Sequence, residues 1–303
     1  MENKWCLLRL LITGASGLYG SKLAKIANKN HIVFSGYSQN QTYSGIPIQF
    51  DVSNKNSVKR AFKKAKPEVV VHAAALTEVD KCETNRELAW RINVEGTRNI
   101  SEEVQRDGAF LVFVSTDYIF NGETGRYKET DDPDPINFYG FTKLKSEELI
   151  KEAVKEYCIV RASVIYGSTP AAGKINFALW LINKLKSNEQ AKIITDQWNS
   201  PTLNTNMAEM TLEIIERKFT GIYHISGETR ISRYDFAMQM AKKLNLDSKL
   251  IKPIQSAELT WAARRPKDSS LDTLKAQKTL KKQPLQINQA LEIMKNELTQ
   301  LRQ

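Results

Sequence analysis

The residues of this chain best suited to proton transfer are Tyr139 and Lys143, which frame the run Tyr-Gly-Phe-Thr-Lys. On a helix, side chains four positions apart lie on the same face, so the phenol and the ammonium would be neighbours. A phenol with an ordinary pKa of about 10 exchanges protons poorly at neutral pH until a nearby cation lowers that pKa. The pair therefore predicts an acid–base group in which Lys143 lowers the pKa of Tyr139, although the same spacing also arises by chance on many helices.

A second polar group precedes this pair. Ser115 and Thr116 follow an apolar run at residues 109–114. Parallel sheets place their sites at the carboxyl ends of strands, so we expect the Thr116 hydroxyl to bond a substrate oxygen. The predicted catalytic set is Thr116, Tyr139 and Lys143, with Ser115 against a cofactor. Without Tyr139, a polar cap at a strand end would explain Ser115 and Thr116 better than catalysis does.

Upstream, the chain carries a glycine-spaced turn, Gly14-x-x-Gly17-x-x-Gly20, between an apolar run and a helical pattern. In that context such a turn favours dinucleotide binding, because glycine lets the backbone approach a pyrophosphate and the helix start offers free N–H groups. A structural turn without a ligand is the alternative. The predicted contacts are Gly14, Ser16, Gly17, Leu18, Tyr19 and Gly20.

The segment after the second apolar run bears on which dinucleotide binds. NAD sites usually place an acidic residue there to bond the ribose 2′-hydroxyl. No acidic residue occurs between Glu2 and Asp51, so NADPH is expected and NADH stays possible. Further cofactor contacts are predicted at Asp51 and Val52, and at Ala73, Ala74 and Ala75. An ordinary turn or helix cap, and close packing, are the respective alternatives.

The elements that must position these residues alternate along the first half of the chain. Strand-like runs at 7–13, 32–37, 68–72, 109–114 and 158–161 are separated by helical patterns. This alternation predicts an α/β fold with a doubly wound parallel Rossmann sheet in a domain at 1–160. Helices are expected at 175–186, 204–217, 233–244 and 285–301, in a smaller substrate-binding α/β cap at 161–303. A strand near 221–226 is expected between turns and could return to the main sheet.

Composition narrows the class of protein. The chain has 303 residues, 41% of them hydrophobic and 26% charged, and no apolar run long enough to cross a bilayer. The formal net charge is +10, and its lysines recur in patterns typical of solvent-exposed helix faces. The sequence contains no recognisable nucleic-acid-binding module beside them. Its three cysteines and three histidines have no metal-site or disulfide spacing. We therefore expect a reduced cytoplasmic protein that binds no metal, nucleic acid or membrane.

Taken in order, these motifs resemble the extended short-chain dehydrogenase/reductase superfamily and, more narrowly, the dTDP-4-dehydrorhamnose reductase family. The resemblance covers nearly the full length. Three runs separate this branch from related epimerases and dehydratases: Ser-Thr-Asp-Tyr at 115–118, Asp-Gln-x-x-x-Pro-Thr at 196–202, and Arg-Pro-x-x-Ser-x-Leu-Asp at 265–272.

The resemblance implies reduction of the C4 ketone of dTDP-4-dehydro-6-deoxy-L-mannose, or of a related sugar nucleotide, with NADPH or NADH. Tyr139 would donate the proton. Lys143 would act on Tyr139 electrostatically and bind the ribose of the cofactor, and the Thr116 hydroxyl would adjust the pKa of Tyr139. The implied substrate contacts are Thr116, Asp117, Val164 and Arg265, the last against the nucleotide phosphates. A homodimer is also implied. Val164 stands where the family often has Trp, so an aromatic wall is missing unless another residue such as Trp198 supplies it.

A second interpretation from a different class stays open. The β subunit of methionine adenosyltransferase resembles the same branch, so the chain could be a non-catalytic, NADP-binding regulatory subunit. The intact Thr116, Tyr139 and Lys143 favour the enzyme.

Overall fold

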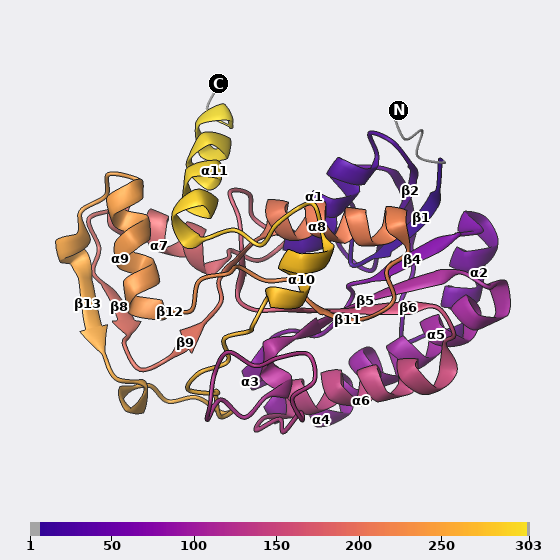
Figure 1. Cartoon of the computed structure of the whole chain (residues 1–303), viewed down its shortest axis with the longest axis horizontal. Coiled ribbons are helices and arrows are strands. Elements are labelled where there is room, and N and C mark those ends of the chain that lie inside the picture. Colours follow the sequence, from indigo (N-terminus) through magenta and orange to yellow (C-terminus); the bar gives the residue numbers. More distant parts are fainter. Residues whose placement is uncertain (1–6, 302–303) are drawn as a thin grey trace.

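The centre of the protein is a seven-stranded parallel β-sheet, seen in a computed structural model that describes residues 7–301 (Figure 1). Its strands are β1 (Arg9–Thr13), β2 (Ile32–Tyr37), β3 (Ile46–Gln49), β4 (Val69–His72), β5 (Phe110–Thr116), β6 (Tyr157–Ala162) and β11 (Gly221–His224). They lie in the order β11-β6-β5-β4-β1-β2-β3. The order of strands reverses between β1 and β4, and ligands of such sheets bind outside the strand ends at this point. The predicted doubly wound parallel sheet is confirmed.

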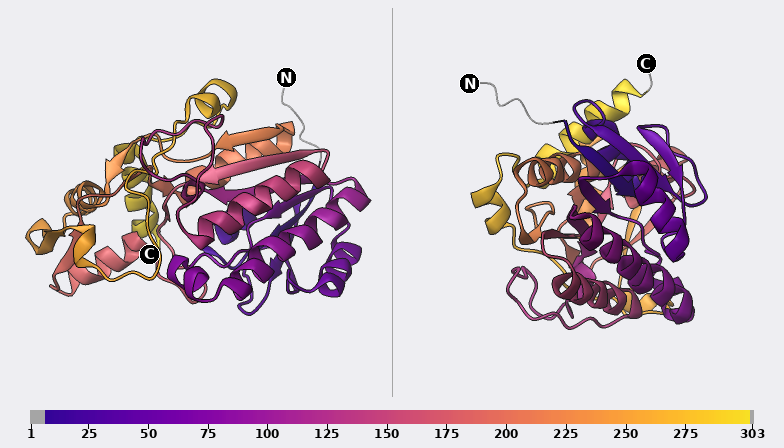
Figure 2. Two further views of the ribbon diagram at one scale, coloured as in Figure 1. Left: turned by 90° about the horizontal axis from the view of Figure 1, so that it is seen from below. Right: turned by 90° about the vertical axis from the view of Figure 1, so that its right-hand side faces the viewer.

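Helices cover both faces of the sheet (Figure 2). One face is covered by α1 (Leu18–Ala27) and α8 (Asn204–Arg217), and the other by α2 (Lys55–Ala65), α5 (Gly96–Asp107) and α6 (Phe138–Ala153). The central strands are therefore buried on both sides, and Val69, Val70 and Val71 have no exposed surface. A strand enclosed in this way needs apolar residues at every position, which explains the unbroken valine run.

The second half of the chain contributes to both lobes. Strand β11 pairs in parallel with β6, and α8 packs on α1, so both belong to the sheet lobe. The predicted boundary at residue 160 falls inside β6. The smaller lobe contains β7 (Ile165–Tyr166), α7 (Phe177–Lys186), β8 (Ala191–Ile194), β9 (Trp198–Asn199), β10 (Thr202–Leu203), β12 (Ile231–Ser232), α9 (Arg233–Lys243), β13 (Ile251–Ile254) and α11 (Ile287–Gln300), with short 3₁₀ turns at Ser248–Leu250 and Ser256–Glu258. It has its own apolar core, formed mainly by α7, α9 and α11.

Shorter elements connect the sheet to the site. After β4 come α3 (Val79–Thr84), α4 (Arg86–Trp90) and a π-helix, η1 (Arg91–Glu95), which runs directly into α5. A 3₁₀ turn, η2 (Asp117–Ile119), follows β5, and α10 (Leu274–Thr279) packs near β11. Strand β3 was not among the predicted strands. It is a four-residue edge strand containing Pro47, and proline is tolerated at a sheet edge because its missing N–H faces outward.

A buried ion pair fixes α6 against the sheet. Arg161 in β6 donates from Nε to Glu147 Oε1 at 3.0 Å and from Nη2 to Glu147 Oε2 at 2.7 Å. Both side chains are almost fully buried, so each charge depends on the other for its solvation. The pair fixes the position of α6, the helix that carries Tyr139 and Lys143.

Among residues 7–301, no helix combines the length and the apolar character needed to cross a bilayer.

Cys82 and Cys158 are buried free thiols, whereas Cys6 lies outside the described residues.

Candidate active site

The three predicted catalytic residues meet at the carboxyl end of the sheet. Thr116 is the last residue of β5, and Tyr139 and Lys143 lie in the first turns of α6. Asn137 caps this helix by accepting a hydrogen bond from the Gly140 N–H at 2.9 Å. A Cβ atom at Gly140 would collide with the carbonyl oxygen of Tyr118, so glycine is what lets α6 approach the end of β5 so closely.

The two titratable groups are perturbed by burial, in opposite directions. Tyr139 is half-buried, yet the atoms packed around its hydroxyl raise its pKa above the ordinary value, while a hydrogen bond with Thr116 lowers it in part. Burial lowers the pKa of Lys143 to about 7. Its Nζ lies 3.9 Å from the centre of the Phe113 ring. The predicted lowering of the Tyr139 pKa by Lys143 is not found: burial dominates the shift, and Lys143 is not among the groups that contribute to it.

Asp117 has a different position from the one expected of a sugar ligand. Its side chain is 3% exposed and accepts hydrogen bonds from Thr116 at 3.0 Å, Ser163 at 2.8 Å and Ser269 at 2.6 Å. Burial raises its pKa, while these three hydroxyls lower it in part. In this structure Asp117 orients Thr116 and joins β5 to two loops of the smaller lobe. Ser163 and Ser269 were missed, although Ser269 belongs to the Arg-Pro-x-x-Ser run.

A buried asparagine in the π-helix was also missed. Asn93 accepts from the Leu76 N–H at 2.7 Å and donates to the Leu76 carbonyl at 3.1 Å and to Thr142 Oγ1 at 2.9 Å. Its own carbonyl accepts from Ser146 Oγ at 2.9 Å. Asn93 therefore ties the loop after β4 to the catalytic helix. An asparagine among the apolar residues of a helical stripe is the signal that would have indicated it.

The glycine turn has the geometry that a dinucleotide needs. Gly14 has a φ of +67°, and a Cβ there would lie 2.8 Å from the backbone nitrogen of Ala74. Gly20 lets the first turn of α1 pack against the Gly14 carbonyl. Helix α1 starts after Gly17 with no side-chain cap and no acidic residue in its first turn, so its N–H groups favour an anion.

Thr13, next to this turn, organises the loop after β4. Its hydroxyl accepts hydrogen bonds from the N–H groups of Ala73 at 3.1 Å and Ala74 at 3.0 Å. The hydroxyl hydrogen is then available to His72 Nδ1, 2.8 Å away. Burial, and secondarily Lys143, lowers the pKa of His72 to about 3, so it is neutral. Ala73, Ala74 and Ala75 are thus held beside the turn, and each is half-buried.

The other predicted cofactor residues differ in which of their atoms remain available to a ligand. Ser115 Oγ is buried and has no hydrogen-bond partner within residues 7–301, as expected of a group that awaits a ligand. Ser16 and Leu18 are half-buried at the turn. Tyr19, however, packs its ring into the core, so its backbone alone remains for cofactor contact.

The contacts of Asp51 and Val52 favour the structural alternative, an ordinary turn, over a cofactor contact. Val52 belongs to the core under α2 and α5. The Asp51 carboxylate accepts from both the N–H and the hydroxyl of Ser53 at 2.9 Å, which is a turn contact at an exposed position.

A loop of the smaller lobe packs against the glycine turn. We call residues 169–174 the strap. Its Ala172 N–H donates to the Ser16 carbonyl at 3.1 Å, and a Cβ added to Gly173 would lie 3.8 Å from Asn40. Lys174 Nζ lies 3.4 Å from Glu78 Oε2. The strap therefore spans from the glycine turn and the loop after β2 to the loop after β4.

Between the lobes, next to η2, lies a cavity of about 290 Å³ that we call the interlobe cavity. It is lined by Val79, Tyr118, Ile194, Gln197, Arg233, Trp261 and Arg265. Arg265, the predicted phosphate ligand, is present but already paired with Asp80. Trp261 and Tyr118 supply aromatic surface, whereas Trp198 is not part of this lining and has Arg230 over its ring at 5.3 Å.

Val164 has a strained backbone where the chain leaves β6 for the smaller lobe. Its φ is +37°, a region that a β-branched residue rarely adopts. The side chain is half-buried, and its carbonyl accepts from the Thr202 N–H at 3.1 Å. Such strain is concentrated at functional sites, where the surrounding structure holds it in place.

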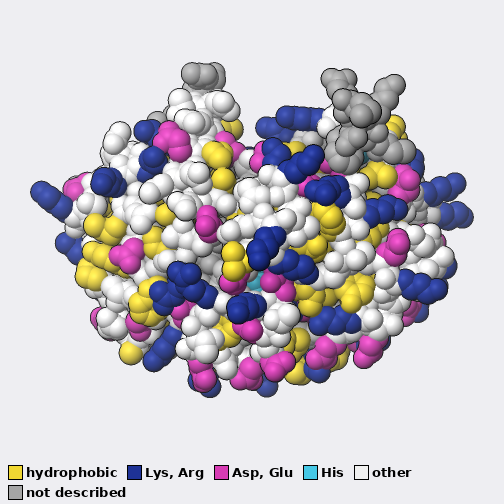
Figure 3. Space-filling model, viewed as in Figure 1, with side chains coloured by type: hydrophobic (Ala, Val, Ile, Leu, Met, Phe, Trp, Pro, Cys, Tyr) yellow, Lys and Arg dark blue, Asp and Glu magenta, His cyan; other side chains and the backbone are white. Residues whose placement is uncertain are grey.

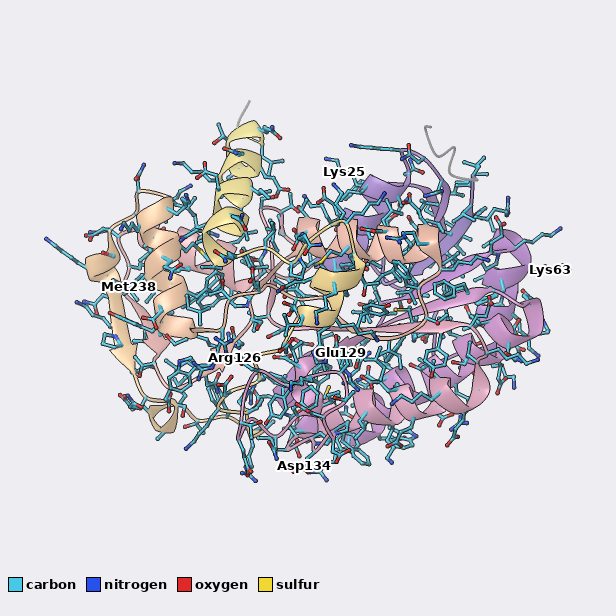
Figure 4. All side chains as sticks on the ribbon, in the orientation of Figure 1. Lys25, Lys63, Arg126, Glu129, Asp134 and Met238 are labelled. Atoms are coloured by element: carbon cyan, nitrogen blue, oxygen red, sulfur yellow. The ribbon has the colours of Figure 1, made fainter. Side chains whose placement is uncertain are left out.

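A larger hollow, of about 810 Å³, lies at the opposite end of the strands. Its basic residues are Lys59, Lys63, Lys66, Arg106 and Lys218. Lys63 marks this end of the molecule and Met238 the other, with Arg126 and Glu129 between them (Figure 4). Helices α2, α5 and α8 all end here, and basic side chains at helix carboxyl ends complement the helix dipole. On the face shown in Figure 3, basic and acidic side chains are interspersed.

The sheet order, the glycine turn and the Thr-Tyr-Lys group together define a dinucleotide-binding protein of the short-chain dehydrogenase/reductase class. Within that class, the chain belongs to the family described as RmlD substrate binding domain, whose model matches residues 8–300. No group of three or more His, Cys, Asp or Glu side chains with metal-binding geometry occurs within residues 7–301.

Individual relatives support this assignment. The chain is 32% identical over 300 residues to the dTDP-4-dehydrorhamnose reductase of Aggregatibacter actinomycetemcomitans, covering 94% of this chain and 97% of that protein. It is 34% identical to methionine adenosyltransferase 2 subunit beta of Xenopus laevis, covering 89% and 82%. The crystal structure of dTDP-4-dehydrorhamnose reductase from Bacillus anthracis in complex with NADP has a TM-score of 0.86 at 31% identity, covering 96% and 100%.

Proposed function

We propose that the protein is an NADPH-dependent nucleotide-sugar reductase. It reduces the C4 ketone of dTDP-4-dehydro-6-deoxy-L-mannose, or of a related 4-keto sugar nucleotide, to the alcohol, which in the first case is dTDP-L-rhamnose. The observation that carries this proposal is the meeting of Thr116 and Tyr139 at the end of β5, at the same edge of the parallel sheet as the uncapped start of α1. The relatives named reductases cover nearly the whole chain.

The residues present fit a dinucleotide. The turn at Gly14, Ser16, Gly17, Leu18 and Gly20 would receive the pyrophosphate, Ala73 to Ala75 would lie along the cofactor, and the unpartnered Ser115 hydroxyl would meet it. No acidic residue follows β2 before Asp51, so nothing there repels a 2′-phosphate, which favours NADPH over NADH. When bound, the cofactor supplies the hydride.

The side chains supply the proton. Burial keeps Tyr139 protonated and makes it a weaker acid than a free phenol, but it can still donate to the substrate oxygen, because the alkoxide that develops there is a stronger base than a phenolate. Thr116 is fixed by Asp117 and positions that hydroxyl. Lys143, buried beneath, would bind the ribose and stabilise the phenolate after proton transfer.

The direct test follows nicotinamide absorbance with NADPH and dTDP-4-dehydro-6-deoxy-L-mannose. Tyr139→Phe should lower turnover by about 10²- to 10⁴-fold, the usual contribution of a general acid, while NADPH affinity stays nearly unchanged. Turnover that survives in Tyr139→Phe would remove this residue from its role. Oxidation of NADPH by neither this sugar nor a panel of UDP- and GDP-linked 4-keto sugars would reject the reductase.

A non-catalytic regulatory subunit is the second candidate. The 34% identity to a methionine adenosyltransferase subunit and the Val164 substitution favour it. It predicts NADPH binding without turnover, together with co-purification of a synthetase, whereas sugar-dependent oxidation of NADPH would exclude it as the sole role.

We further infer a cytoplasmic homodimer. The family resemblance supports it, and light scattering of the purified chain tests the oligomeric state: a mass near twice 34.5 kDa is expected, and a stable monomer contradicts it.

A further inference from the structure

We propose that Arg233 is the principal ligand of the diphosphate of the substrate, and that Asp80 holds Arg265 in a neutralised pair until the diphosphate arrives. This inference deepens the proposed function and rests on it. Arg233 was not among the residues that the sequence singled out.

The pairing of Arg265 is the first step. Its Nη1 lies 2.5 Å from Asp80 Oδ1 and its Nη2 lies 2.7 Å from Asp80 Oδ2, which is a two-point guanidinium–carboxylate contact. The Ala263 N–H donates to the same carboxylate at 2.9 Å. These bonds, with that of Arg265 foremost, lower the pKa of Asp80 to about 2, so it remains charged. The net charge that Arg265 presents to the interlobe cavity is therefore close to zero.

Arg233 lines the same cavity without such a partner. It is the first residue of α9, and its Nε donates to the neutral amide oxygen of Gln197 at 3.2 Å. The nearby carboxylate of Asp235 is bonded instead to the Ser232 hydroxyl at 2.7 Å. Within residues 7–301 no carboxylate forms an ion pair with Arg233, so it is the uncompensated cation of the cavity. A guanidinium binds phosphate oxygens through two parallel N–H groups.

The distance from the catalytic tyrosine suits this ligand. Arg233 and Tyr118 line the same cavity, and the Tyr118 ring packs edge-on against Tyr139 with centroids 6.1 Å apart. One tyrosine thus separates the proton donor from the free guanidinium. In a sugar nucleotide, C4 and the phosphate-bearing C1 lie on opposite sides of one pyranose ring. A diphosphate at Arg233 would therefore leave the C4 ketone near Tyr139.

The Asp80 pair adds a prediction of its own. An incoming diphosphate competes with the Asp80 carboxylate for Arg265, because both bind the guanidinium through two oxygens. Removing the charge of Asp80 should free Arg265 and strengthen binding of the diphosphate. If the cavity does not bind phosphates, the affinity should not change.

The test measures the affinity of the full-length protein for dTDP and for NADPH by calorimetry. Arg233→Gln should weaken dTDP binding by at least ten-fold and leave NADPH binding within two-fold. Asp80→Asn should strengthen dTDP binding by two- to ten-fold. Lys243→Gln is the matched control, because it removes the same charge from the same helix at an exposed ion pair with Glu292. It should leave both affinities within two-fold.

Each contrary result has a distinct meaning. If Arg233→Gln binds dTDP within two-fold of the natural protein, or if Lys243→Gln loses as much affinity, Arg233 is not the ligand. A parallel loss of NADPH binding would show that Arg233→Gln damages the fold, and Arg233→Lys, which keeps the charge, should then bind dTDP better than Arg233→Gln. If the natural protein binds NADPH but none of dTDP, UDP or GDP, both this inference and the sugar-nucleotide part of the proposed function fail, while the dinucleotide site stands.

Discussion

At the scale of single residues, the site pairs a tyrosine that burial keeps neutral with a lysine that burial makes easier to deprotonate. Tyr139 holds its proton more tightly than a free phenol, whereas Lys143 has a pKa of about 7. The two shifts have one cause, since a poorly solvated position disfavours the charged form of either group. The burial of Lys143 is therefore expected to lower the stability of the fold.

This cost gives the first prediction. The pKa of Lys143 is about 7 in the folded protein and 10.5 in the unfolded chain, so the unfolded state binds more protons between these values and wild-type stability rises with pH across them. Lys143→Met has no such dependence. It should be more stable than the natural protein by as much as a few kcal/mol at pH 7 and below, with the gap closing toward pH 10.5.

Thermal unfolding across this pH range measures the difference, and activity should be lost in the same variant. A constant difference between the two proteins at all pH values would contradict the assignment. Lys145→Met is the control, since its ammonium is exposed and paired with Glu148.

At the scale of elements, α6 is positioned by one interior ion pair. Glu147→Ala leaves the guanidinium of Arg161 buried without a counter-charge, and breaking such a pair costs about 3–5 kcal/mol. Unfolding in urea measures this loss. Glu148→Ala, one position along the same helix, removes an exposed pair with Lys145 and should cost less than about 1 kcal/mol. Equal losses would mean that burial of the Arg161 pair is unimportant.

The strap is a second element whose stability can be tested. It is held by the Ala172–Ser16 backbone bond and by the exposed Lys174–Glu78 pair, and such pairs contribute up to about 1 kcal/mol. If the strap covers the bound cofactor, Lys174→Ala should speed NADPH dissociation by about two- to five-fold in stopped-flow fluorescence. Lys81→Ala removes the other lysine near Glu78 and should not change this rate. An unchanged rate in Lys174→Ala would show that the strap does not retain the cofactor.

At the scale of the whole molecule, one carboxylate joins the last helix to the sheet lobe. Glu297 in α11 accepts hydrogen bonds from Ser168 at 2.5 Å, Thr205 at 2.6 Å and Lys22 of α1 at 3.1 Å. Burial opposes its ionisation, but these donors together lower its pKa. A lowered folded-state pKa means that the stabilisation is present above the ordinary glutamate pKa and is lost as pH falls through the folded value.

Glu297→Gln should therefore lower the free energy of unfolding by about 1–3 kcal/mol at pH 7. The difference should shrink below the ordinary glutamate pKa of about 4.5. Chemical unfolding at both ends of this range measures it. Glu292→Gln, on the same helix in an exposed pair with Lys243, serves as the control. A difference that grows on acidification would contradict the sign of the linkage.

The sequence by itself determined the features that local chemistry controls. The valine run of β4, the glycine turn before α1 and the Tyr139–Lys143 spacing each predict a structure from neighbours in the chain, and the sheet and catalytic group follow from them. The edge strand β3 was missed because a four-residue segment with three exposed residues and a proline carries little signal.

Only the tertiary structure decided which charges remain free. Arg265 and Asp80 are 185 positions apart, and Asp117 meets Ser269 across 152, so no local pattern shows that these groups are already paired. The same holds for the sign of the Tyr139 shift, which depends on what is packed around the hydroxyl. Spacing along a helix brings a lysine near a tyrosine, but desolvation by distant segments sets the proton affinity of both.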